Sequence, residues 1–347
     1  MSSLELLYEL VKIPSTSTHE REISIFLENK LEDLGMEITR SGNNLIGKLG
    51  QGRPTLMLCG HLDTVPPFIP PHIKGTRLFG RGAADDKGGL AAVINAIASI
   101  EQRKLKGTLL TTFVIDEELK SQGAQDILPY IDADFGVVCE PTNLKIVNGH
   151  KGRVTFYIET VGRSAHASTP ELGKNAIVAM AKLVFLIDKM LLMKHPVLGS
   201  ETMTVSTITG GDAPNIVPNR CRIGVDYRYV PPHDVFSVLE MLRAKLSDAK
   251  IEFAEGPRNF SQPFCLPNHE IITFLEESIR YSGQNPQVVT MDASTDASRF
   301  NEAGIPTVVF GPGDIAQAHT TDEWIDIRDV ETASVIFGEL IKRVLMA

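Results

Sequence analysis

The sequence predicts an α/β protein made of a mostly parallel sheet flanked by helices, with a second, α+β domain inserted into it. Short apolar runs alternate with helical patterns over residues 1–152 and again over 267–347. Residues 153–266 follow a different order, β-α-β-β-α-β, which is the split βαβ or ferredoxin-like pattern. The chain of 347 residues is 43% hydrophobic, which is enough for two cores.

The first domain opens with two predicted helices, at about 3–12 and 19–34, and Ser17 and Glu20 are spaced as a capping box for the second. The apolar strands that follow are 44–50, 55–62, 108–115 and 135–141. Helices are expected from about 88, where apolar residues recur at helical spacing, and at about 124–131. After the insertion, helices are expected in residues 268–283 and in the amphipathic segment that ends the chain.

The inserted domain has six expected elements. They are strand 154–161, helix 175–187, strands 202–208 and 221–230, helix 235–246 and strand 250–255. In the first of these helices, one face is expected to pack inward through Ile177, Met180, Ala181, Val184 and Ile187.

Composition excludes several classes of protein. The formal net charge is -9 and the pI is near 5.5, with no basic stripe, so we expect no nucleic-acid partner. The most apolar long segment is interrupted by Lys182 and Asp188, and the N-terminus carries acids, so we expect neither a membrane span nor a secretory signal. Four cysteines without CxxC spacing indicate reduced thiols and a cytoplasmic location.

Ionisable residues follow the predicted strands where each one ends. His61 and Asp63 are two apart in extended backbone and project to the same face. An imidazole beside a carboxylate is either a metal ligand with its orienting partner or half of an acid/base pair. The other residues of this kind are Asp85, Glu117, Glu118, Glu140 and His319.

The carboxyl ends of the strands form the binding crevice of an open α/β sheet. Carboxylates that converge there would repel one another unless cations lie between them. Two histidines and three carboxylates suit two divalent ions, with zinc the first choice and cobalt or manganese as alternatives.

A series of motifs carries a family resemblance over nearly the whole chain. In order they are GHLDTV, LFGRGAADDKGG, IDEE, VCEPT, GRSAHASTPELGKNAI, GGDAPNIVP, DYRYVPP, STDAS and the histidine of AQAHTTDEW. The chain resembles the dinuclear-zinc aminoacylase/carboxypeptidase metallopeptidase family, which includes acetylornithine deacetylase, succinyl-diaminopimelate desuccinylase and glutamate carboxypeptidase. The resemblance implies a zinc-peptidase-like catalytic domain and an inserted lid and dimerisation domain.

The resemblance also implies roles for residues of the first domain. Asp85 would bridge two metal ions, with His61 and Glu140 on one ion and Glu118 and His319 on the other. Asp63 would orient the His61 ring. Glu117 would be the general base that takes a proton from a metal-activated water.

Three residues of the inserted domain receive roles by the same resemblance. His166 would reach across a homodimer to the carbonyl oxygen of the substrate. Asn215 and Arg228 would bind the substrate's α-carboxylate, which an arginine fork suits. The alternative for Arg228 is a structural ion pair with Asp226 or another acid.

The sequence departs from its relatives at two places. Asp86 follows Asp85 where relatives often have Met, so it either tunes metal affinity or points to solvent. Arg299 falls one residue later than in some relatives and receives no role, whereas Asp296 is expected to make a structural contact.

The predicted function is removal of an N-acyl group from an amino acid. The alternatives are a carboxypeptidase or dipeptidase, and a hydrolase of lysine or ornithine linked to a carrier protein. A non-catalytic binding protein would have lost a ligand or the base, and every assigned position is filled. Nucleotide-binding and serine-hydrolase classes are disfavoured because GxGxxG, GxxxxGK[ST] and GxSxG are all absent.

Overall fold

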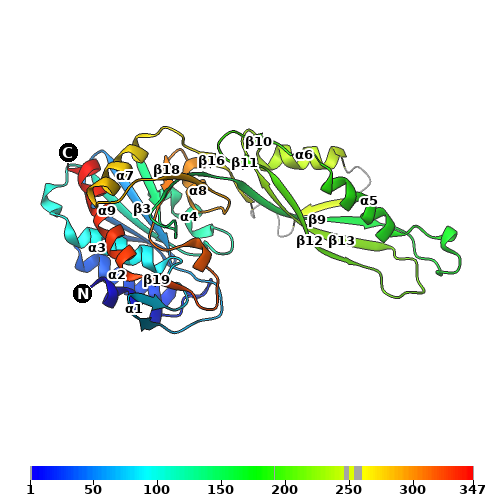
Figure 1. The fold of residues 1–347 in the computed structure, drawn as a ribbon, viewed down its shortest axis with the longest axis horizontal. Coiled ribbons are helices and arrows are strands. Elements are labelled where there is room, and N and C mark those ends of the chain that lie inside the picture. Colours follow the sequence, from blue (N-terminus) through cyan, green and yellow to red (C-terminus); the bar gives the residue numbers. More distant parts are fainter. Residues whose placement is uncertain (1, 191, 246–249, 254–259, 347) are drawn as a thin grey trace. The chain divides into compact units, whose positions relative to one another are not determined.

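The computed structural model describes residues 2–190, 192–245, 250–253 and 260–346. The chain divides into two compact units. The first unit consists of Met1–Gly149, Leu266–Thr290 and Thr295–Ala347, and the second of His150–Cys265 and Met291–Ser294. Figure 1 shows both units in colours that follow the sequence.

A twisted sheet forms the centre of the first unit, in the order β1-β2-β6-β3-β7-β18-β8, with β17 beside β8. The central strands β6, β3, β7 and β18 are parallel, and β1, β2 and β8 pair antiparallel with their neighbours. The bounds of these strands are Glu37–Ser41 (β1), Asn44–Gly50 (β2), Thr55–His61 (β3), Thr108–Val114 (β6), Phe135–Val138 (β7), Ile146–His150 (β8), Val288–Met291 (β17) and Thr307–Val309 (β18). Strands β3 and β6 are buried along their whole length, as their uninterrupted apolar runs predict.

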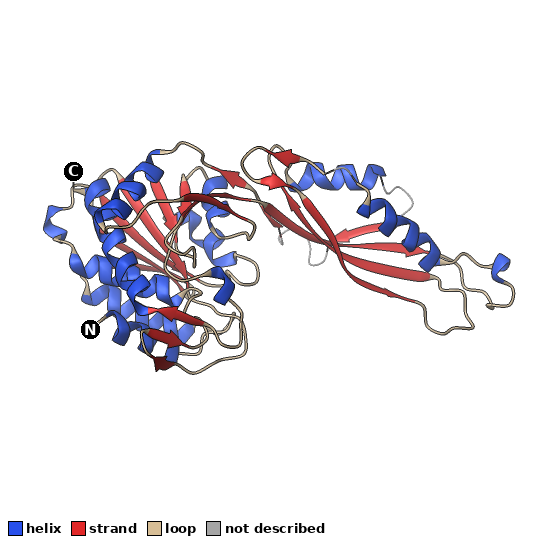
Figure 2. Ribbon diagram, in the orientation of Figure 1, coloured by secondary structure: helices blue, strands red, loops and turns tan. Residues whose placement is uncertain are grey.

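Helices flank this sheet, so the predicted fold class is confirmed (Figure 2). Helices α3 and α9 pack against each other and contact β3, while α4 and α8 contact each other. The bounds of the helices are Ser3–Lys12 (α1), Arg21–Asp33 (α2), Lys87–Ser99 (α3), Gln122–Ile127 (α4), Glu270–Tyr281 (α7), Ala297–Glu302 (α8) and Ile327–Leu345 (α9). The buried stripe of α3, Leu90, Val93, Ile94 and Ile97, belongs to the core and fixes the loop that precedes this helix.

A small antiparallel sheet lies at the edge of the first unit, in the order β19-β5-β4. Its strands are only three residues long: His72–Lys74 (β4), Arg77–Phe79 (β5) and Trp324–Asp326 (β19). Strand β5 leads into residues 80–86, which we call the Asp85 loop, and β19 follows the segment that contains His319. The pairing of β5 with β19 therefore brings together two segments that lie far apart in the sequence.

The second unit contains the predicted β-α-β-β-α-β order in an antiparallel sheet, β12-β13-β9-β14, with β15 also beside β9. Helices α5 and α6 contribute side chains to its core, among them Met180, Leu183 and Leu242. The bounds of the elements are Gly152–Val161 (β9), Ala176–Asp188 (α5), Lys194–His195 (β10), Gly199–Ser200 (β11), Thr202–Gly210 (β12), Arg220–Tyr229 (β13), Val235–Lys245 (α6), Lys250–Phe253 (β14), Phe260–Ser261 (β15) and Phe264–Cys265 (β16). The predicted ends of helix 235–246 and strand 250–255, namely Leu246, Ala254 and Glu255, lie outside the described residues.

Two local predictions are wrong. Ser17 and Glu20 form no capping box: the Ser17 hydroxyl donates to Asp63, and the N-cap of α2 is Glu20 without a side-chain bond. Helix α1 has the capping box instead, between Ser2 and Glu5. Ile177 and Ala181 of α5 are exposed, not packed inward, while Met180 and Ile187 are buried as predicted. Among the described residues, no helix is both long and apolar enough to cross a membrane.

Candidate metal centre

Strand β3 positions His61 at its last residue, and the ring is 2% exposed. His61 Nδ1 lies 2.9 Å from the backbone carbonyl oxygen of Asp63, which can only accept, so Nδ1 carries a proton. The other ring nitrogen, Nε2, lies 2.9 Å from Asp85 Oδ1. The backbone therefore sets the tautomer of the ring and turns Nε2 toward the acidic residues of the site.

The Asp63 carboxylate contacts other groups besides the His61 ring. It accepts hydrogen bonds from the Ser17 hydroxyl at 2.8 Å and from the backbone N–H groups of Glu117 and Glu118 at 3.0 and 3.2 Å. Its Oδ1 atom is 3.5 Å from His61 Nδ1. Burial would raise the pKa of Asp63, but the bonds from His61, Ser17 and Glu117 bring that pKa below its ordinary value.

The remaining acidic residues and His319 gather in two groups whose potential ligand atoms lie within 4.8 Å of one another. The His61 cluster consists of His61, Glu117 and Glu140, and the Asp85 cluster of Asp85, Glu118 and His319. The structure thus brings together all six residues, which come from the ends of β3, β6 and β7, from the Asp85 loop and from the segment after β18.

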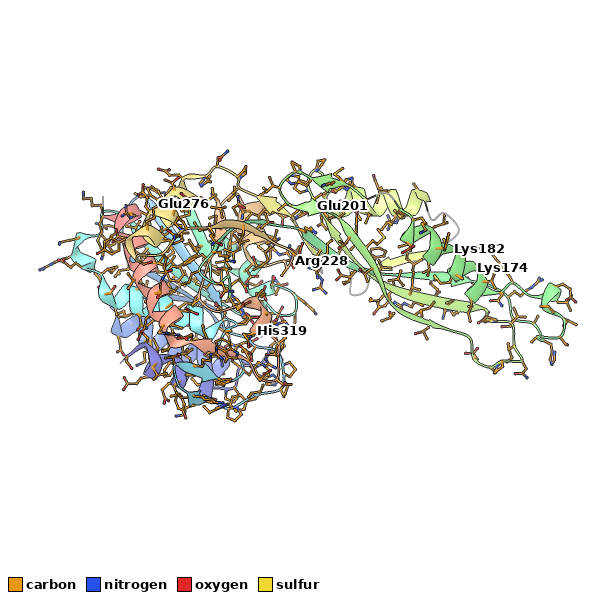
Figure 3. All side chains as sticks on the ribbon, in the orientation of Figure 1. Lys174, Lys182, Glu201, Arg228, Glu276 and His319 are labelled. Carbon is orange, nitrogen blue, oxygen red and sulfur yellow. The ribbon has the colours of Figure 1, made fainter. Side chains whose placement is uncertain are left out.

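Asp85 lies between the two clusters. Its Oδ1 atom faces His61 Nε2, and its Oδ2 atom is 3.6 Å from His319 Nε2. His319 Nε2 also lies 2.9 and 3.0 Å from the two oxygens of Glu118. His319, labelled in Figure 3, is half exposed, so this side of the site is open to solvent within the first unit.

The chemistry of these donors fits divalent cations. Burial, and then the neighbouring acids, raise the pKa of Glu117 and of Glu140 well above the ordinary value. Burial also raises the pKa of Glu118, against the bond from His319. Glu140 Oε1 is buried without a hydrogen-bond partner. Buried carboxylates in such numbers are unfavourable when ionised and alone, and two cations would satisfy them.

The position of the Glu117 carboxylate differs from the one expected of a residue that acts only as a general base. As a general base it would face the substrate, yet its carboxylate groups with His61 and Glu140 as a third potential ligand. Glu118 groups with the other cluster, because adjacent side chains diverge.

Asp86 does not point to solvent, because it is 1% exposed and packs behind the site. Two glycines make room for its carboxylate: a Cβ at Gly89 would lie 2.2 Å from Asp86 Oδ1, and one at Gly60 would lie 2.6 Å from Oδ2. Burial raises the pKa of Asp86 well above the ordinary value.

The other two residues of the departures from relatives lie elsewhere in the first unit. Asp296 is buried, and burial raises its pKa to about 6. Arg299 lies 3.8 Å from Glu302.

His166 and Asn215 meet in the second unit. The backbone N–H of Ala167 donates to the Asn215 carbonyl at 2.9 Å, and His166 forms a β-bridge with Ile216. The Ser168 backbone N–H lies 3.2 Å from His166 Nδ1, which must therefore accept. In the neutral ring the proton is then on Nε2, where the exposed side chain can donate it.

Arg228 has the ion pair that was its alternative role. Its Nε lies 2.7 Å from Asp226 Oδ1, and its Nη1 donates to the Asp292 carbonyl at 3.3 Å. Asp226 also accepts from Arg153 at 3.0 Å. Figure 3 labels Arg228 in the second unit.

Sequence reasoning missed three residues that support the site. Ser17 bonds to Asp63, while Glu323 forms a buried ion pair at 2.7 Å with Arg81 of the Asp85 loop. The only signal in the sequence was the position of Glu323, four residues after His319.

Comparisons with known proteins show the family to which the chain belongs and the fold that it shares. Residues 57–343 match peptidase family M20/M25/M40. The chain is 33% identical to an acetylornithine deacetylase from Proteus mirabilis, over 99% of this chain and 97% of the relative. An aminopeptidase PepT from Bacillus cereus superposes with a TM-score of 0.85 at 24% identity, over 99% of this chain and 98% of that one. A tripeptidase from Staphylococcus aureus gives 0.84 at 26% identity, over 99% and 97%. The family resemblance seen in the sequence is confirmed.

Proposed function

Because the chain belongs to peptidase family M20/M25/M40, a family of metal-dependent hydrolases, we propose that it removes an N-acyl group from an amino acid. The observation that carries the proposal is the meeting of the His61 cluster and the Asp85 cluster at one edge of the sheet. Full-length similarity to an acetylornithine deacetylase supports the choice of reaction.

Two divalent ions, zinc by first choice, would be held by these clusters, one by His61 and Glu140, the other by Glu118 and His319, with Asp85 between them. When bound, such ions polarise a carbonyl group and lower the pKa of a coordinated water. His61, Asp85 and Glu140 are buried, which limits competition from bulk water for these ligands, whereas His319 is half exposed.

Proton transfer is assigned to Glu117. Burial raises the pKa of its carboxylate, which makes it a stronger base than an exposed glutamate. It takes the proton of the attacking water and passes it to the leaving amine as the C–N bond breaks. The products are the free amino acid and the carboxylate of the acyl group.

The second unit supplies the substrate contacts in this proposal. His166 would reach across a homodimer and donate from Nε2 to the carbonyl oxygen as negative charge develops on it. Asn215 and Arg228 bind the α-carboxylate. Arg228 would do so mainly through Nη2, because its Nε bonds Asp226 and its Nη1 donates to the Asp292 carbonyl.

A peptidase is the second candidate, since two well-superposing structures are an aminopeptidase and a tripeptidase. Peptide hydrolysis would use the same clusters and the same base, and differ only in the acyl group. Hydrolysis of a carrier-linked amino acid would again use these residues.

Steady-state hydrolysis separates these reactions. Metal-reconstituted protein is assayed on N-acetylornithine, N-succinyl-diaminopimelate, N-acetylmethionine and a set of dipeptides and tripeptides, each with and without chelator. We expect chelator-sensitive cleavage of one acyl amino acid with kcat/KM of about 10⁴ per molar per second or more. The Glu117→Gln protein is the control for a contaminating hydrolase. Faster cleavage of peptides would replace the deacylase by the second candidate, and chelator-resistant cleavage would contradict both.

We also propose a homodimer formed through the second unit. The outer face of α5 exposes Ile177, Val178, Phe185 and Leu186, and β12 is an exposed edge strand of the sheet in the part of the unit that the structure describes. Sedimentation of the wild type and of Phe185→Glu tests this, because a charge on that face should favour the monomer.

We further propose a cytoplasmic location, which is supported by four cysteines that form no disulfide.

A further inference from the structure

Glu323 is a buried glutamate that no candidate cluster contains, and its carboxylate faces the Asp85 loop. Its Oε1 atom accepts from the backbone N–H groups of Ala84 and Asp85 at 3.0 and 3.2 Å. Its Oε2 atom accepts from the backbone N–H of Gly82 at 3.1 Å and from Arg81 Nη1 at 2.7 Å. Four donors of one short loop therefore converge on a single side chain.

The backbone on either side of Glu323 strengthens this connection. The Gly80 N–H donates to the Glu323 carbonyl at 3.0 Å, and directly beside it Trp324 pairs with Phe79 in the β19–β5 ladder. The first residue of the Asp85 loop, Gly80, is thus bonded to the residue directly before β19, the strand that follows the His319 segment. Glu323 then holds the far end of the loop, up to Asp85 itself.

Charge and burial favour the contact between the Glu323 carboxylate and the N–H groups of the Asp85 loop. Successive backbone N–H groups form a concave site for an anion, and here a side chain of the same protein fills it. Arg81 and Glu323 are 3% and 1% exposed, so each leaves an unpaired buried charge if the other is removed. The contacts of the Glu323 carboxylate in the described part of the chain all go to residues 81–85.

We propose that Glu323 is a positioning residue that fixes Asp85 relative to His319 and thereby strengthens binding of the ion held by the Asp85 cluster. Two of the three members of that cluster, Asp85 and His319, lie on the two segments that Glu323 joins. The His61 cluster draws its members from the ends of β3, β6 and β7, which Glu323 does not contact. This inference rests on the proposed two-metal function. Because Asp85 lies between the two ions whereas His319 belongs to the Asp85 cluster alone, both ions should bind more weakly without Glu323, and the ion of the Asp85 cluster should be affected more strongly.

The test is a stepwise zinc titration of apo-protein against a chromophoric chelator. Glutamine at position 323 keeps the size of the side chain but turns one acceptor into a donor that faces N–H groups. We expect Glu323→Gln to weaken one of the two binding steps by about 10- to 100-fold, in the range found for groups that orient metal ligands. The other step, whose ion shares only Asp85 with the Asp85 cluster, should weaken by a clearly smaller factor. His319→Ala identifies the step that belongs to the Asp85 cluster, and Glu323→Gln should weaken that same step.

Glu339→Gln is the matched control, because Glu339 pairs with Arg343 within α9, away from both clusters. It should leave both zinc affinities unchanged. If Glu323→Gln binds both ions as the wild type does, or loses both affinities equally, the inference is wrong while the metal centre stands. A wild type that binds no ion would overturn the metal centre and this inference together.

A second measurement, on the wild type, tests the inference if the Glu323→Gln variant does not fold. Hydrogen exchange of wild-type apo-protein should show the amides of Gly82, Ala84 and Asp85 protected, although they lie in a loop. Exchange as fast as in the exposed loop around Gly75 would overturn the inference, because the carboxylate would then not hold these amides.

Discussion

The Asp63 carboxylate holds the backbone of Glu117: its Oδ1 atom accepts the Glu117 N–H at 3.0 Å. Strands β3 and β6 are parallel neighbours, with His61 opposite Val114, so the segments that follow them run side by side. The Asp63 carboxylate, just after β3, thereby fixes the backbone of Glu117 and Glu118, which follow β6. Glu117 belongs to the His61 cluster and Glu118 to the Asp85 cluster. In addition to its contact with His61, Asp63 therefore determines the position of Glu117 and Glu118 at the end of β6.

Asp63→Asn should reduce kcat/KM and zinc affinity by about 10- to 100-fold each, because an amide nitrogen would face one of the two backbone N–H groups. Ser17→Ala is the control: it removes a donor to the same carboxylate but leaves both N–H groups bonded. Kinetics and a zinc titration of the two variants measure the difference. Equal effects of the two substitutions would contradict the role of Asp63 in holding the Glu117 segment.

Glu117→Gln should lower kcat by about 10²- to 10⁴-fold, the range for loss of a general base, while the protein still binds two zinc ions. Glu140→Gln serves for comparison and should lose one ion, since Glu140 belongs to the same cluster and is assigned as a ligand. Metal analysis after dialysis distinguishes the two. If Glu117→Gln also loses an ion, Glu117 is a metal ligand as its position in the His61 cluster allows.

Arg228→Ala should raise KM for an N-acyl amino acid about tenfold or more with a smaller change in kcat, the signature of lost substrate binding. Arg153→Ala is its matched control, because both arginines contact the same carboxylate of Asp226. If Arg228 is only the partner of Asp226, the two substitutions should change KM alike.

Lys87 makes stability depend on pH. It is buried, its Nζ donates to the Ile13 carbonyl at 2.7 Å, and burial lowers its pKa to about 7 against a weaker effect of Glu323. Between pH 7 and the ordinary lysine pKa of 10.5, the unfolded chain binds one more proton than the folded chain. The free energy of unfolding therefore rises with pH in this window, by up to about 1.4 kcal/mol per pH unit from this group, and is flat below it.

The Lys87→Met protein should lack that slope. Urea denaturation of both apo-proteins at several pH values from 7.5 to 9.5 gives the difference in slope. Equal slopes would mean that the lysine titrates normally in the folded chain.

The sequence predicted the parts of the site that depend on local pattern. Apolar runs located β3, β6 and β7, and with them the positions of His61, Glu117 and Glu140 at one sheet edge. It could not predict the role of Glu323, because the Arg81–Glu323 contact spans 242 residues and depends on two three-residue strands without a recognisable pattern. It misassigned Ser17 because the tertiary partner Asp63 recruits a hydroxyl that would otherwise cap a helix. For Ile177, apolar character alone could not separate the face of α5 that packs on the sheet from the exposed face.

The most direct test of the metal centre is anomalous diffraction from crystals of the zinc-loaded protein, recorded at the zinc absorption edge. Two peaks are expected in each chain, one beside His61 and Glu140 and one beside Glu118 and His319, with Asp85 between them. A single peak, or none at these residues, would contradict a two-metal centre and the hydrolytic mechanism built on it.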